Sequence, residues 1–154
     1  MAETLPLGLD TFARGAIEYL DHYKDDTTAR IVINVYLADY HTATPFIVDT
    51  GAPWCILDPM VFAKVAHYAE PLDMQVLPMS IRGITYQGSL YRLPMRFDAL
   101  IGESQDIAAT VFVPDLHPDD QWRFPNFIGL DGFRNRIRFA VDPASNLFYF
   151  GELM

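Results

Sequence analysis

Apolar and polar residues alternate along several short segments of the chain, most clearly over residues 30–40. From Ile31 to Leu37 every second side chain is an aliphatic one, which is the period of a β-strand with one buried face. A second apolar run, Pro45–Val48, follows the polar stretch 39–44, whose composition is typical of a turn. The pattern therefore predicts an antiparallel hairpin over residues 30–49.

Prolines and glycines divide the rest of the chain into further short apolar runs. There are eleven prolines and nine glycines, which favours many strands and turns over long helices. The expected elements are a long hairpin at 74–97 with its tip within 82–88, a strand at 106–115, an apolar segment at 127–133 and a closing hairpin at 136–153. These segments predict an all-β, mostly antiparallel fold.

Two short helices are also expected. Residues 9–26 carry an apolar stripe at helical spacing, although Gly15 lowers the helix propensity there. Farther along, Asp58 followed by Pro59 is a typical helix start, and Pro71 would end the helix that they begin.

Length, charge and cysteine content limit the class of protein. The 154 residues suit one domain, which we divide into an N-terminal helical extension at 1–29 and a folded domain at 30–154. A formal net charge of −9 repels phosphate and argues against nucleic acid as a partner. No apolar segment is long enough to span a bilayer, no signal peptide is evident, and one cysteine cannot form an internal disulfide. We expect a cytoplasmic protein that does not bind membranes.

The strongest chemical signal is an acid at the end of an apolar run. Asp49 follows Phe46–Val48 and precedes Thr50, Gly51 and Ala52. A carboxylate at this point is expected to lie at the edge of the core, partly desolvated. Gly51 would allow a sharp turn, and Thr50 would offer a hydroxyl to hold the geometry. The sequence therefore makes Asp49 the candidate catalytic residue.

The segment FIVDTGA at 46–52 resembles the signature of the retropepsin-like aspartic proteases. Two further elements of that family follow in order: a glycine-containing flap hairpin, IRGITYQGS at 81–89, and two apolar residues before a glycine, FIG at 127–129. The final strand, NLFYFG at 146–151, extends the resemblance to most of the chain. It implies a closed acid-protease barrel, mostly antiparallel, with a flap hairpin and two short helices.

The same resemblance implies an aspartic endopeptidase that hydrolyses a peptide or protein substrate without a metal or organic cofactor. The implied catalytic residues are Asp49, Thr50, Gly51 and Ala52, and the implied substrate-binding residues are Gly83, Ile84, Thr85, Tyr86, Ile128 and Gly129. In this family two aspartates flank one water and share one proton. The chain has no second Asp-Thr-Gly or Asp-Ser-Gly, so the resemblance implies a homodimer in which two Asp49 residues meet on a two-fold axis.

Other acids near glycine or proline have simpler interpretations. Asp58 and Asp142 each precede a proline and are expected to be a helix cap and a turn residue. Asp131 precedes Gly132 but lies where the family has a helix. The acidic loop at 115–126 is expected to be a solvated addition to the family fold. Cys55 is expected to be a core thiol, and the four histidines show no metal-ligand spacing.

Two other functions are compatible with the sequence. The first is a catalytically inactive retropepsin-like module that mediates dimerisation or peptide binding, because a fold does not determine an activity. The second is an unrelated β-barrel that binds small apolar ligands. That barrel would suit the 14% aromatic content but leaves the Asp-Thr-Gly-Ala motif without a role.

Overall fold

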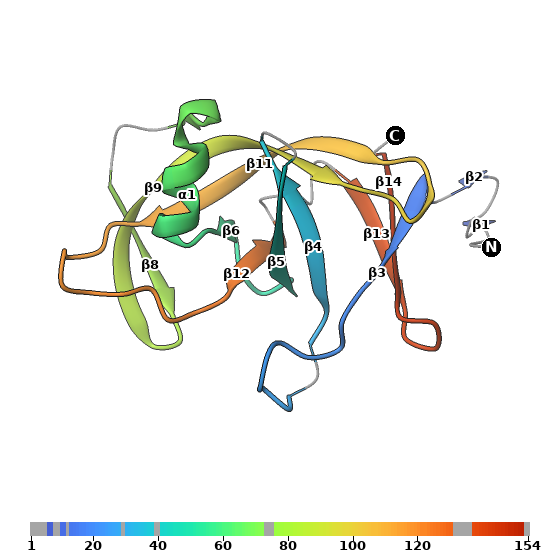
Figure 1. Ribbon diagram of the computed structural model, residues 1–154, viewed down its shortest axis with the longest axis horizontal. Coiled ribbons are helices and arrows are strands. Elements are labelled where there is room, and N and C mark those ends of the chain that lie inside the picture. Colours follow the sequence, from blue (N-terminus) through green and yellow to red (C-terminus); the bar gives the residue numbers. More distant parts are fainter. Residues whose placement is uncertain are drawn as a thin grey trace.

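A computed structural model describes residues 6–7, 10–11, 13–28, 30–38, 41–72, 76–130 and 137–152. The first half of these contains β1 (Pro6–Leu7), β2 (Asp10–Thr11), β3 (Gly15–Glu18), β4 (Val32–Leu37), β5 (Thr42–Asp49), β6 (Cys55–Ile56), α1 (Pro59–Val65), the 3₁₀ helix η1 (Ala66–Tyr68) and β7 (Glu70–Pro71). The second half contains β8 (Leu77–Ile81), β9 (Ile84–Phe97), β10 (Ile101–Gly102), β11 (Gln105–Pro114), β12 (Asn126–Gly129), β13 (Ile137–Asp142) and β14 (Leu147–Glu152). Figure 1 shows their arrangement.

Six strands form a hydrogen-bonded ring within the larger sheet. Around it β11 pairs with β6, β6 with β12, β12 with β5, β5 with β4, β4 with β9, and β9 with β11. The β12–β5 and β11–β6 pairings are parallel, and the other four are antiparallel. The expected mostly antiparallel β fold is therefore confirmed in its main features, but the sheet is mixed.

The ring closes around an apolar core. In β4 the alternation noted in the sequence places Ile33, Val35 and Leu37 inside with no exposed surface. Their neighbours on the inside include Phe46 from β5 and Leu93 from β9, which are also fully buried. Burying one such side chain stabilises a fold by about 1.5–3 kcal/mol, so these strands hold the ring together.

A four-stranded sheet of order β10-β3-β14-β13 lies beside the ring (Figure 1). The helix expected at 9–26 is wrong, because residues 15–18 form β3, which pairs with β14 and β10. The pairing with β14 outweighed the helical spacing, and Gly15 allows the Glu103 backbone to come close, since a Cβ there would overlap the Glu103 carbonyl oxygen. The N-terminal segment is thus joined to the C-terminal hairpin, and the division of the chain into an extension at 1–29 and a domain at 30–154 stays a prediction.

The second expected helix is confirmed at its start as α1, in green in Figure 1. Its expected end at Pro71 is wrong, because α1 ends at Val65, a 3₁₀ turn follows to Tyr68, and Pro71 belongs to β7. The Asp58 carboxylate caps α1 by accepting a hydrogen bond of 2.8 Å from the Met60 N–H, and Pro59 occupies the first turn. The expected turn at Asp142 is also confirmed, since its carboxylate accepts hydrogen bonds from the Ala144 N–H and the Ser145 hydroxyl. No helix in the described ranges has the length and apolar character needed to cross a bilayer.

Candidate active site

Asp49 is the last residue of β5, and a tight turn follows it. The Gly51 N–H donates to Asp49 Oδ1 at 3.0 Å, and the Ala52 N–H donates to the Asp49 carbonyl oxygen at 3.2 Å. These hydrogen bonds fix the position of the Asp49 carboxylate. Ala52 is buried, with 8% of its surface exposed. Asp49, Thr50 and Gly51 are exposed in the single chain. The expected partial desolvation of Asp49 stays a prediction, because the structure of one chain shows only that the residue is exposed.

The predicted FIG element forms the end of β12, which lies next to this turn and holds it by backbone hydrogen bonds. In the parallel register Gly129 stands beside Asp49, and the Leu130 N–H donates to the Ala52 carbonyl oxygen at 2.8 Å. A Cβ at Gly129 would overlap the carbonyl oxygen of Trp54, so only glycine allows this approach. Ile128 is 1% exposed within the core. The element holds the acid-bearing turn in place, and the predicted contact of Ile128 and Gly129 with substrate stays a prediction.

The predicted flap is the hairpin of β8 and β9. Its turn is Arg82–Gly83, with φ angles of 50° and 82°, as a two-residue hairpin turn requires. The tip therefore lies at the start of the expected range, and Ile84, Thr85 and Tyr86 already belong to β9. Gly88 is not part of the tip, because it pairs with β8 and β11.

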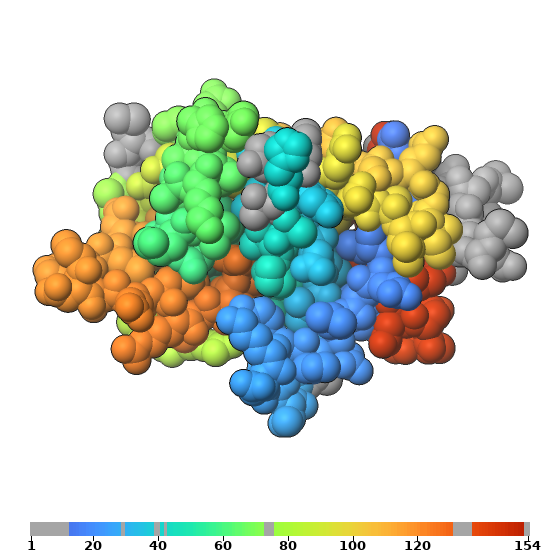
Figure 2. Space-filling view, in the orientation of Figure 1, coloured from blue at the N-terminus to red at the C-terminus, as the bar shows by residue number. Residues whose placement is uncertain are grey.

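An aromatic cluster braces this hairpin from the side. The Tyr86 ring lies 5.4 Å from the Trp122 ring and 6.2 Å from the Phe124 ring, both edge-on. The Arg82 guanidinium lies 5.3 Å from the Phe124 ring. The segment 115–125, expected to be a solvated loop, thus also packs against the flap, and it projects in orange at one end of Figure 2. Its aromatic residues were the sequence signal for this contact.

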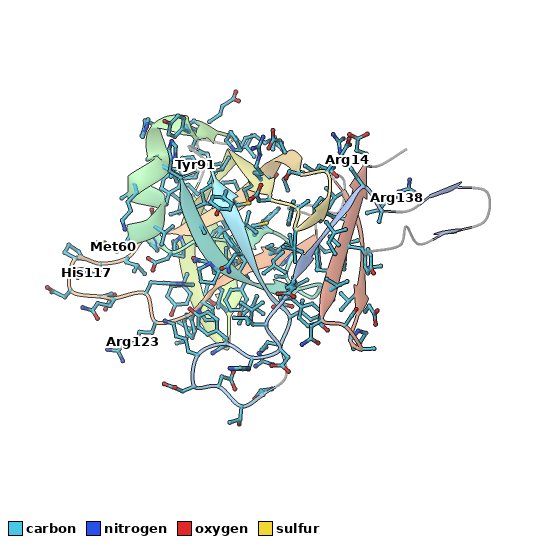
Figure 3. The ribbon with its side chains drawn as sticks, turned by 45° about the vertical axis from the view of Figure 1, so that its right-hand side comes forward. Arg14, Met60, Tyr91, His117, Arg123 and Arg138 are labelled. Carbon is cyan, nitrogen blue, oxygen red and sulfur yellow. The ribbon has the colours of Figure 1, made fainter. Side chains whose placement is uncertain are left out.

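We expect Trp122→Ala to loosen the flap. Each aromatic pair contributes roughly 0.5–1.5 kcal/mol beyond burial, so amide exchange at Ile81 and Ile84 should rise by about tenfold. Hydrogen exchange followed by mass spectrometry measures this. His117→Ala, an exposed change on the same segment (Figure 3), is the control and should leave the exchange unaltered. Equal exchange in both variants would contradict the bracing role.

Asp49 and the flap tip line one cavity of about 400 Å³. Most of its lining residues come from β5 with the turn after it and from residues 79–82 of the hairpin, and the others are Arg30, Ile56 and Phe127. Of the predicted site residues, Asp49, Gly51 and Ala52 line this cavity, and the sequence analysis missed its other members, among them the two arginines Arg30 and Arg82. The predicted hairpin at 30–49 could have identified Arg30. Val32 pairs with Ile47, and the same antiparallel register, continued by two residues, places Arg30 opposite Asp49.

Among the described residues that line this cavity, Asp49 alone carries a carboxylate. Asp131, the other candidate near a glycine, lies outside the described residues. The described His, Cys, Asp and Glu side chains form no group of three that could hold a metal ion. Burial raises the pKa of the Cys55 thiol to about 12, opposed by a weaker hydrogen bond from the Gly129 backbone. Its core position, with 1% exposure, confirms the expected buried thiol.

Comparison with known proteins supports the fold. No protein-family model matches the sequence, and no curated protein matches it. Among solved structures, the chain is similar to a retropepsin-like aspartic protease from Rickettsia conorii, with a TM-score of 0.52 and 17% sequence identity. The match covers 90% of this chain and 94% of that one. The resemblance suggested by the sequence is therefore confirmed at the level of structure, and the chain has the retropepsin-like aspartic protease fold.

Proposed function

We propose that the protein is an aspartic endopeptidase that acts as a homodimer, with one Asp49 from each subunit. The observation that carries this proposal is the position of Asp49, which the turn at Gly51 fixes in the lining of a cavity that residues 79–82 of the β8–β9 hairpin also line. A peptide bound there would lie between the acid and a hairpin edge that can offer main-chain hydrogen bonds.

In the proposed reaction the two carboxylates share one proton, because adjacent like charges resist double ionisation. The ionised Asp49 takes a proton from a water as that water attacks the scissile carbonyl carbon. The protonated Asp49 donates a hydrogen bond to the carbonyl oxygen as it gains charge. The amine then leaves with a proton returned from the pair. The turn at Gly51 supplies part of the fixed geometry that this exchange needs.

A second copy of the chain supplies the second acid in this proposal. The cavity of one chain offers one carboxylate among the described lining residues, and this carboxylate is exposed. A two-fold axis beside Asp49 would pair it with its equivalent and cover both. The exposed position of Asp49 in one chain is what such an assembly requires.

We therefore expect activity to depend on concentration. Below the dissociation constant of the dimer, each tenfold dilution should lower the activity per chain by about tenfold, because the dimer fraction falls with dilution. Cleavage of a peptide library, read by mass spectrometry, and sedimentation velocity on the same samples measure both quantities. A fully active monomer would contradict the proposal, and a dimer that binds peptides without cleaving them would favour the inactive binding module.

A further inference from the structure

The cavity at Asp49 is lined by two arginines from distant parts of the chain. Arg30 precedes β4, and Arg82 is the first residue of the hairpin turn between β8 and β9. Among the described lining residues, Arg30, Arg82 and Asp49 are the only ionisable ones. One chain therefore places two positive charges and one carboxylate around the space that we assign to the substrate.

Aromatic rings hold Arg82 at the cavity wall. Its guanidinium carbon lies 5.3 Å from the Phe124 ring centroid and 5.9 Å from that of Phe127, and Phe127 also lines the cavity. Stacking on ring faces orients the planar group and leaves its N–H donors at the rim available. Arg82 is exposed and forms no ion pair with any described carboxylate. It is suited to bind an anion that enters the cavity.

The backbone fixes Arg30 beside the acid. The Val48 N–H donates to the Ile31 carbonyl oxygen at 2.9 Å, which holds the end of the segment next to β5. Arg30 also forms an ion pair with Asp26 at 3.6 Å. The pKa of the Asp26 carboxyl is lowered, first by hydrogen bonds from Thr28 and then by the charges of Arg30 and Arg82. Asp26 thus lies near both arginines, but it is not part of the cavity lining.

The local charge has the opposite sign to that of the whole chain. The protein carries a formal net charge of −9, yet its cavity at Asp49 is net positive by one charge. In the proposed dimer the excess is larger, because two carboxylates that share one proton carry a single negative charge against two arginines from each subunit. Asp26 offsets part of this excess at Arg30 from outside the lining, so the charge that a substrate would balance lies mainly at Arg82.

We propose that the cavity selects peptides with an aspartate or glutamate side chain close to the scissile bond, bound by Arg82 and, more weakly, by Arg30. This inference rests on the proposed peptidase function. Arg82 is the main determinant because Asp26 already pairs with Arg30. The planar guanidinium binds a carboxylate by donating two parallel N–H hydrogen bonds, which favours a glutamate side chain over the isosteric glutamine amide.

The test uses peptides that differ only by glutamate or glutamine, with the substitution moved through each position around a cleaved bond. At one or more positions, kcat/KM should be higher for the glutamate peptide by about tenfold, the factor that corresponds to about 1.4 kcal/mol. Arg82→Gln should reduce this ratio to near one, and Arg82→Lys should retain part of it. Near-UV circular dichroism checks that the exposed change leaves the core packing intact.

Arg123→Gln is the matched control, because it removes the same charge from a residue outside the cavity lining (Figure 3). It should keep the full preference for glutamate. Raising the salt concentration should weaken the preference in the wild type, since exposed charges are screened. Cleavage with equal kcat/KM for both peptides, or a preference unaltered in Arg82→Gln, would overturn the inference and leave the proposed peptidase function in place.

Binding separates this inference from the proposed function. The same peptides, labelled with a fluorophore, are titrated with the wild type and with Asp49→Asn, each with and without Arg82→Gln. Tighter binding of the glutamate peptide by about tenfold, lost in Arg82→Gln, supports the inference even if no peptide is cleaved. If the glutamate peptide is preferred neither in binding nor in cleavage, the inference is overturned.

Discussion

Asp49→Asn is expected to abolish peptide cleavage while leaving the fold and the dimer intact. Asparagine keeps the shape of the side chain and can still accept from the Gly51 N–H through its oxygen, so the turn is preserved. It cannot take a proton from water at neutral or acidic pH. Because a symmetric dimer loses both acids at once, we expect kcat/KM to fall by about 10⁴-fold or more. Initial rates on a cleaved peptide measure the loss.

Asp119→Asn is the matched control, since it makes the same change at an exposed position on the segment 115–125. Its kcat/KM should stay within twofold of the wild-type value, roughly the range expected of a distant surface change. Cleavage by Asp49→Asn at a rate similar to the control would contradict the assignment of Asp49 as the catalytic acid.

Mixing the two chains tests whether the acids act as a pair. A ninefold excess of Asp49→Asn should lower the activity of a fixed amount of wild type to about one tenth, because most wild-type chains then pair with an inactive partner. A wild-type activity unaffected by the excess would show that one Asp49 is sufficient.

Local patterns in the sequence predicted the parts of the fold that local interactions determine. The hairpin at 30–49 and the start of α1 at Asp58 were both predictable, since alternation and capping are properties of neighbouring residues. The segment 9–26 was assigned the wrong structure because β3 is short and mostly buried, and a short apolar run fits either a helix or a strand. Its pairing with β14, far along the chain, decided the outcome.

The acid of the candidate site was predictable, but its surroundings were not. Asp49 lies within a motif of four consecutive residues, so the sequence alone was sufficient to single it out. Arg82 lines the same cavity only because the β8–β9 hairpin brings its turn to the part of the fold that holds Asp49. Trp122 and Phe124 meet Tyr86 through a segment with no regular structure, whose path the pattern of residues does not specify.

Gly129→Ala is expected to destabilise the protein strongly. The added Cβ would overlap the Trp54 carbonyl oxygen and would lie 2.8 Å from the Ala52 carbonyl oxygen, and both are backbone atoms that cannot rotate away. Moving them means moving the turn that carries Asp49 or breaking the parallel β12–β5 pairing. We expect the free energy of unfolding in urea to fall by about 3 kcal/mol or more, as for severe overpacking.

Gly83→Ala separates this steric effect from the loss of glycine itself. Gly83 has a φ angle of 82° and no atom within 4 Å of the position that a Cβ would take, so alanine there meets backbone strain alone. We expect a loss of only about 1 kcal/mol. If the free energy of unfolding falls by the same amount in both variants, the crowding at Gly129 does not contribute to stability. If Gly129→Ala loses far more, the close approach of β12 to the Trp54 backbone stabilises the site, and activity should fall more in this variant than its residual folded fraction predicts.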